Sequence, residues 1–134
     1  MRRIILTTAA VLILGTSGAF AGGFNIAQVV QAGLQNGAVV DQTTAIASTA
    51  DVGQAGYRNS AAVVQENGSV LNVAVVRQYG AKNNAAIVQY ANGGNAAATI
   101  QYGAYNQALV TQGGVNSTAI IAQAGVNNQA WIKQ

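Results

Sequence analysis

Ten short segments of this chain repeat one pattern, in which every second residue is of a fixed kind. Each segment carries Asn or Ser, then Ala, then Val, Ile or Thr, then Gln, with one variable residue in between. The first segment is 25–31 and the last is 128–134. Because side chains two positions apart lie on the same face of a β-strand, the pattern predicts ten strands with one common face.

The segments come in pairs joined by a short turn. A Gly stands two residues after the first Gln of each pair, and an Asn three residues later opens the second segment. Glycine permits the positive φ that tight turns require. The chain has no Pro, which suits strands whose N–H groups are needed for pairing. The turn glycines are Gly33, Gly56, Gly80, Gly103 and Gly125.

A strand–turn–strand unit that recurs at a nearly fixed spacing is typical of a solenoid. We therefore predict an all-β fold, a cross-β β-solenoid of five rungs. Each rung is one pair of strands, stacked on the next at about 4.7–4.9 Å. The five repeats lie near 25–42, 48–65, 72–89, 95–112 and 117–134.

The common face is expected to point inward, where Ala and the β-branched residues form a thin, dry seam between two sheets. The flanking Asn, Ser and Gln also point inward, which is costly unless their polar groups are hydrogen-bonded. Identical amides on successive rungs can bond to one another as ladders along the axis. The predicted ladder and assembly positions are Asn25, Gln31, Asn36, Gln42, Ser48, Gln54, Asn59, Gln65, Asn72, Gln78, Asn83, Gln89, Asn95, Gln101, Asn106, Gln112, Ser117, Gln123, Asn128 and Gln134.

A disordered, aggregation-prone tract rich in Asn and Gln is the main alternative for the fold. Disorder does not require amides at a fixed phase relative to Ala and Val, however. Since this chain keeps that phase in every segment, we favour the solenoid.

The first residues have the form of a secretory signal peptide. Arg2 and Arg3 precede a mainly apolar run over 4–14, and an Ala-x-Ala cleavage motif follows at 19–21. We therefore predict a signal peptide over 1–21 and a mature domain over 22–134. The alternative is a membrane anchor, but the apolar run is shorter than the ~20 residues that a spanning helix needs. We expect no membrane span in the mature chain.

Removal of the signal peptide changes the charge of the chain. The mature part keeps four basic residues, Arg58, Arg77, Lys82 and Lys133, against three acidic ones, so the net charge falls from +3 to 4 − 3 = +1. The basic character therefore gives little reason to expect a nucleic-acid partner. A low net charge also removes a usual barrier to self-association.

The sequence offers little catalytic chemistry. It contains no His and no Cys, and its carboxylates are Asp41, Asp51 and Glu66. The pattern places the first two on outward faces of opposite sheets and the third in a turn, so no two can act as an acid–base pair. We expect no enzymatic activity, no metal and no cofactor. We interpret the three carboxylates as gatekeepers that slow aggregation of an exported chain.

The full unit, Ser/Asn-x5-Gln-x-Gly-x2-Asn-x-Ala-x3-Gln, resembles the curlin repeat of bacterial curli fibre subunits. All five units match it at every named position, from residue 25 to residue 134. The resemblance implies a functional amyloid, secreted and assembled as an extracellular cell-surface fibre (a curli-like pilus) for biofilm matrix and surface adhesion. It also implies a homopolymer, a nucleator subunit as partner, and export unfolded through a dedicated outer-membrane pore with its chaperones.

One feature differs from the enterobacterial major subunit, in which a pore-targeting segment separates the signal peptide from the repeats. Here only 22–24 stand between the two. Five complete repeats favour the main subunit over the nucleator, which is the first alternative. The second is a monomeric binding solenoid such as an ice-binding protein, which would need an aligned outward row of Thr. The outward residues Thr49, Thr111 and Thr118 do not form such a row.

Overall fold

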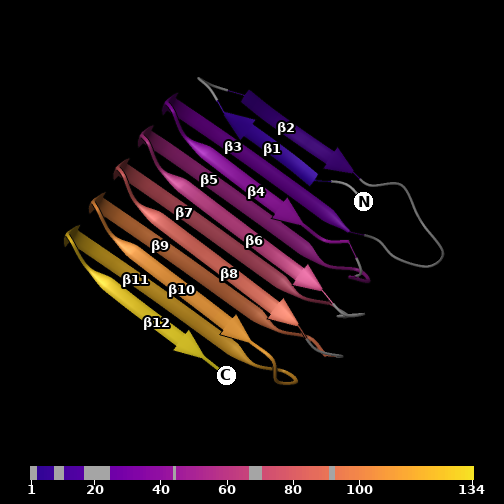
Figure 1. Ribbon diagram of the computed structural model, residues 1–134. Coiled ribbons are helices and arrows are strands. Elements are labelled where there is room, and N and C mark those ends of the chain that lie inside the picture. Colours follow the sequence, from indigo (N-terminus) through magenta and orange to yellow (C-terminus); the bar gives the residue numbers. More distant parts are fainter. Residues whose placement is uncertain (1–2, 8–10, 17–24, 44, 67–70, 91–92) are drawn as a thin grey trace.

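The computed structural model describes residues 3–7, 11–16, 25–43, 45–66, 71–90 and 93–134. Every regular element in this part of the chain is a β-strand. Ten of the strands form five successive pairs, and equivalent strands of successive pairs are parallel neighbours in two sheets (Figure 1). The all-β solenoid predicted from the repeat is therefore confirmed.

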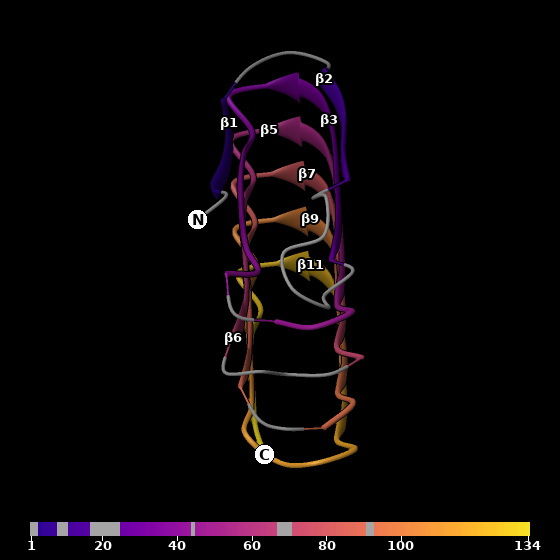
Figure 2. The ribbon, with the colours of Figure 1, turned by 90° about the vertical axis from the view of Figure 1, so that its right-hand side faces the viewer.

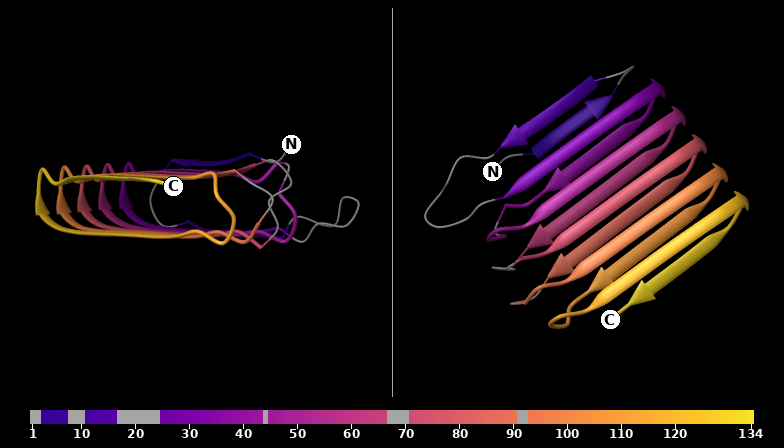
Figure 3. Two further views of the ribbon diagram at one scale, coloured as in Figure 1. Left: turned by 90° about the horizontal axis from the view of Figure 1, so that it is seen from below. Right: turned by 180° about the vertical axis from the view of Figure 1, so that it is seen from behind.

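The two sheets face each other as flat layers, which are seen edge-on in Figure 3 (left). We call them the first-strand sheet and the second-strand sheet. The first-strand sheet contains β3 (Ile26–Leu34), β5 (Thr49–Tyr57), β7 (Val73–Ala81), β9 (Ala96–Ala104) and β11 (Thr118–Val126). The second-strand sheet contains β4 (Gly37–Asp41), β6 (Ser60–Glu66), β8 (Asn84–Tyr90), β10 (Gln107–Gln112) and β12 (Gln129–Lys133).

The parallel register places like residues beside like. Gln31 is level with Gln54, and Gln78 with Gln101, because the repeats stack without a shift. The buried apolar core is the seam between the sheets, made of the inward Ala and β-branched residues. Thr99 is the one polar member of the β-branched set, and it is fully buried. A one-residue slip would turn this whole face outward, so burial specifies the register.

The ends of the strands differ from the expectation. The first strand of each pair extends through its turn glycine, as β3 does through Gly33 to Leu34. The Asn that was expected to open the second strand lies just before it, as Asn36 does before β4. The turn between them also holds a second residue with positive φ, directly before that Asn. These residues are Gln35, Arg58, Lys82, Tyr105 and Asn127.

The turn glycines are required by close contact between rungs as well as by φ. Each has a φ between +106° and +124°, a region that other residues rarely adopt. A Cβ built on Gly33 would lie 1.9 Å from the carbonyl oxygen of Gly56 on the next rung. A side chain at Gly33, Gly56, Gly80 or Gly103 would therefore separate the rungs.

Two further strands lie in the predicted signal peptide. β1 (Arg3–Thr7) pairs antiparallel with β4, and β2 (Val11–Thr16) pairs antiparallel with β3. They lie at one end of the stack, while β11 and β12 are the outermost strands at the other end (Figures 1 and 2). The remaining residues of 1–21 lie outside the described part. With β1 and β2 in place, β3 and β4 are covered, and β1 and β2 are the outermost strands at that end.

Candidate functional site: two amide ladders and an open last rung

A column of glutamines runs through the core side of the first-strand sheet. The Nε2 atom of Gln31 donates to Oε1 of Gln54 at 2.6 Å, and Gln54 donates in the same way to Gln78 at 2.7 Å. The column continues from Gln78 to Gln101 and from Gln101 to Gln123, each at 2.8 Å. Every bond points the same way, from the earlier rung to the later one. The ladder therefore has a donor end and an acceptor end.

The second-strand sheet carries an equivalent column. Its Nε2-to-Oε1 distances are 2.7 Å from Gln42 to Gln65, 2.9 Å from Gln65 to Gln89 and 2.9 Å from Gln89 to Gln112. The last step, from Gln112 to Gln134, is 3.2 Å. Both columns donate in the same direction along the axis.

These amides also join the two sheets. The second N–H of Gln89 donates across the seam to the carbonyl of Val73 at 3.1 Å, and Gln78 donates to the carbonyl of Ser60 at 2.9 Å. Each such glutamine thus bonds along its own sheet and to the facing one. This satisfies the buried N–H groups, which would otherwise cost about 1–3 kcal/mol each.

The asparagines of the turns bond differently from the expected amide-to-amide ladder. Oδ1 of Asn36 accepts from the backbone N–H of Asn59 at 3.0 Å. Nδ2 of Asn59 donates to the carbonyls of Ala55 in β5 of its own rung (3.2 Å) and Gly80 on the next rung (3.1 Å). Since Asn is one methylene shorter than Gln, its amide lies against the turn backbone. These columns therefore fix the turns.

The predicted ladder positions differ in burial according to their rung. Those in the middle rungs are buried, whereas the less buried ones all lie in the first or last rung. The less buried positions are Asn25, Gln42, Ser117, Asn128 and Gln134. The inward residues of β12, Ala130 and Ile132, are half-buried, while their equivalents in β10 are buried. In β12 the last rung thus leaves partly exposed the inward residues that a following rung would cover.

The first-strand ladder is incomplete at both of its ends. Oε1 of Gln31 and Nε2 of Gln123 are buried, and neither has a hydrogen-bond partner among the described residues. One is an acceptor and the other a donor, and they lie at opposite ends of the same column. The two unfilled groups are complementary to each other on a second copy.

The predicted gatekeepers occupy three different environments. Asp51 forms an ion pair with Arg77, whose side chain lies across Gly53 on the neighbouring strand. The hydrogen bond donated to Asp51 raises the pKa of the Arg77 guanidinium. Oδ1 of Asp41 accepts from the backbone N–H of the residue two positions on, at 3.2 Å. Glu66, expected in a turn, is instead the exposed last residue of β6.

The sequence pattern did not predict that Arg77 pairs with Asp51. A Gly in the middle of a strand pattern often marks a close approach of another group, and Gly53 is such a residue. A Cβ there would meet Cδ of Arg77 at 3.0 Å. The missing side chain of Gly53 thus makes room for Arg77 to reach Asp51 on the adjacent strand.

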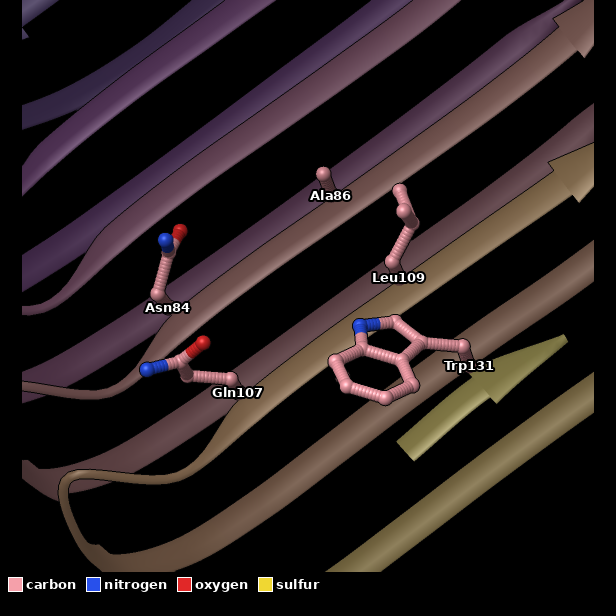
Figure 4. A pocket seen from close by; sticks show the side chains of 6 residues that line it. Asn84, Ala86, Gln107, Leu109 and Trp131 are labelled. Atoms are coloured by element: carbon pink, nitrogen blue, oxygen red, sulfur yellow. The ribbon is translucent and has the colours of Figure 1, made fainter. Parts of the chain in front are cut away.

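A shallow hollow lies on the outer face of the second-strand sheet, near the C-terminal end of the stack (Figure 4). The amides of Asn84 and Gln107 lie on one side, and Ala86, Leu109 and Trp131 lie on the other. The Trp131 side chain is 67% exposed. The hollow lies against the last rung, so its lower rim is the open edge of β12.

The described residues hold no group of three or more His, Cys, Asp or Glu side chains placed to bind a metal. In the same part of the chain, no helix is long and apolar enough to cross a membrane. No family model, no curated protein and no solved structure matches the chain. At the end of the stack, β11 and β12 are the outermost strands of their sheets, and Gln123 keeps a buried N–H without an acceptor among the described residues.

Proposed function

We propose that this protein is a secreted structural subunit that self-assembles into curli-like extracellular amyloid fibres, serving as biofilm matrix and in surface adhesion. The observation that carries the proposal is the glutamine column of the first-strand sheet. Among the described residues, it ends in a buried acceptor without a donor on Gln31 and a buried donor without an acceptor on Gln123. A second copy of the chain supplies both missing partners.

Assembly proceeds by adding the first rung of one copy to the last rung of another. The new contact repeats the one already made between every two rungs. Nε2 of Gln123 donates to Oε1 of Gln31 on the next copy, as Gln101 does to Gln123 within the chain. The backbone groups of β11 and β12, at the outer edges of the two sheets, pair with those of β3 and β4. Open strand edges template such additions.

Removal of the signal peptide controls one of the two growing faces. β1 and β2 pair with β4 and β3, the strands on which a second copy stacks. Cleavage after Ala21 removes both strands and opens that edge. The chain is therefore able to grow at both faces only after it has been processed during export.

The resemblance to the curlin repeat supports the cellular part of the proposal. By that resemblance, the partners are further copies of this chain, a nucleator subunit and a dedicated export pore with its chaperones. The complete last repeat supports the role of main subunit, since the last rung keeps the ladder residues Gln123 and Gln134.

The test is assembly of the purified mature chain in dilute buffer, followed by sedimentation and electron microscopy. We expect fibres that display reflections near 4.7–4.8 Å and ~10 Å. Deletion of the chromosomal copy should also remove fibres from the cell surface. A chain that stays soluble and monomeric for days at micromolar concentration would sink the proposal.

A further inference from the structure

The outward face of the second-strand sheet carries one column with opposite charges at its two ends. The register aligns Asp41 with Val64, Val64 with Val88, Val88 with Thr111, and Thr111 with Lys133. Asp41 is on the first rung and Lys133 is on the last. Between them the column holds only uncharged side chains.

The column predicts which two residues lie side by side where one copy stacks on the next. From β4 to β12, every adjacent pair of strands keeps the same parallel register, so β4 of the next copy should stack on β12 as β12 stacks on β10. Position 133 then lies directly beside position 41 of the next copy. From this we propose, on the basis of the proposed stacking, that an ion pair between Lys133 and Asp41 of the next copy sets the register of the junction.

The N-terminal strand gives independent support for a cation at this place. In the chain that keeps residues 3–7, β1 covers the edge of β4, and Arg3 is the residue aligned with Asp41. The register thus aligns a basic residue with position 41 in β1, and the proposed stacking aligns another, Lys133, with the same position from a neighbouring copy. Removal of β1 vacates the position that Lys133 then fills.

The pair cannot act within a single copy. Asp41 and Lys133 are separated by four strand spacings, which is about 19 Å. This exceeds the Debye length of about 8–10 Å at physiological or similar ionic strength. Any coupling between substitutions at the two positions must therefore come from contact between copies.

The experiment is a charge swap in seeded growth of the secreted, mature chain. Lys133→Asp and Asp41→Lys are made singly and together, and each is offered as monomer to seeds of its own kind. Each single variant places like charges side by side at every junction, whereas the double variant restores an opposite pair. The matched controls are Lys82→Asp and Glu66→Lys, which make the same charge changes away from the junction.

At low salt we expect each single variant to elongate roughly three- to tenfold more slowly than the wild type, since cross-strand like charges oppose pairing. The double variant should recover most of the rate, the two controls should stay close to wild type, and the differences should shrink in high salt. Single variants that grow at the wild-type rate, or a double variant slower than either single one, would overturn the inference. If the wild type itself forms no fibres, the proposed function fails, and the inference fails with it.

Discussion

Nε2 of Gln101 donates to Oε1 of Gln123 at 2.8 Å, whereas Nε2 of Gln123 has no acceptor in the described part of the chain. The Gln123 side chain thus accepts the last hydrogen bond of the column within one copy. Its own N–H remains free to donate to the next copy. In the proposed assembly, Gln123 therefore links the stability of the last rung to the growth of the fibre.

Gln123→Ala should therefore slow assembly more than Gln129→Ala. The first change leaves the buried N–H of Gln101 without an acceptor, at a cost of roughly 1–3 kcal/mol, and removes the donor to the next copy. Gln129 is exposed on the outward face of β12, so its loss should matter little. The measurement is the lag time of unseeded assembly for both variants. Equal lag times would mean that the inward column does not contribute to growth.

Gly125→Ala should stop elongation of the fibre end to which it adds. A Cβ at Gly103 would lie 2.0 Å from the carbonyl oxygen of Gly125, but a Cβ at Gly125 meets only Nδ2 of Asn128, at 3.3 Å, within one copy. The next copy would place its Gly33 carbonyl where Gly125 stands relative to Gly103. A Gly125→Ala copy can therefore add to a seed through its first rung. Once added, its last rung accepts no further copy.

The measurement is seeded elongation of wild-type monomer with a small fraction of Gly125→Ala. We expect inhibition out of proportion to that fraction, because each incorporated copy blocks one end. Val126→Ala is the control, since this exposed neighbour keeps the turn glycine. Inhibition no greater than simple dilution of the wild type would contradict the proposed contact between turns.

Thr99→Val should stabilise the fibre. Thr99 is fully buried between Val76 and Ile121 in its column, and its hydroxyl has no hydrogen-bond partner among the described residues. Val has nearly the same shape as Thr and lacks the hydroxyl. A buried hydroxyl without a hydrogen-bond partner costs about 1–3 kcal/mol of stability. The denaturant concentration that dissolves half of the fibres should rise. Val76→Thr is the reverse change and should lower it.

Trp131 should report formation of the junction. It is the one tryptophan of the chain, and it is 67% exposed on the outward face of β12. The proposed register places Val39 of the next copy beside it. We expect its fluorescence emission to shift to shorter wavelength in step with the sedimentable fraction. Emission that stays at the wavelength of a solvated indole in mature fibres would place the junction elsewhere.

The strand faces and the rung count could be predicted from the sequence because Ala, β-branched residues and Gln keep one phase throughout. That phase determines which side chains the seam buries. The fold therefore follows from the period of the pattern and from Gly at positions such as Gly33, where a neighbouring carbonyl leaves no room for a Cβ.

Other features depend on contacts that no period encodes. Arg58 and Lys82 take positive φ, and neither residue type indicates such a backbone. The turn asparagines bond to backbone groups, which depends on how closely the turns approach. The pairing of Asp51 with Arg77 over Gly53 becomes visible only when β5 and β7 are aligned. The pairing of β1 and β2 with the first rung likewise joins segments that share no repeat.

The most direct test of rung-by-rung stacking is the mass per unit length of single protofilaments, measured by scanning transmission electron microscopy. Each copy supplies five rungs, so rung-by-rung stacking predicts one copy for about every 24 Å of fibre axis at a rung spacing of ~4.8 Å. One copy for every ~4.8 Å, as when each chain forms a single flat layer, would contradict it.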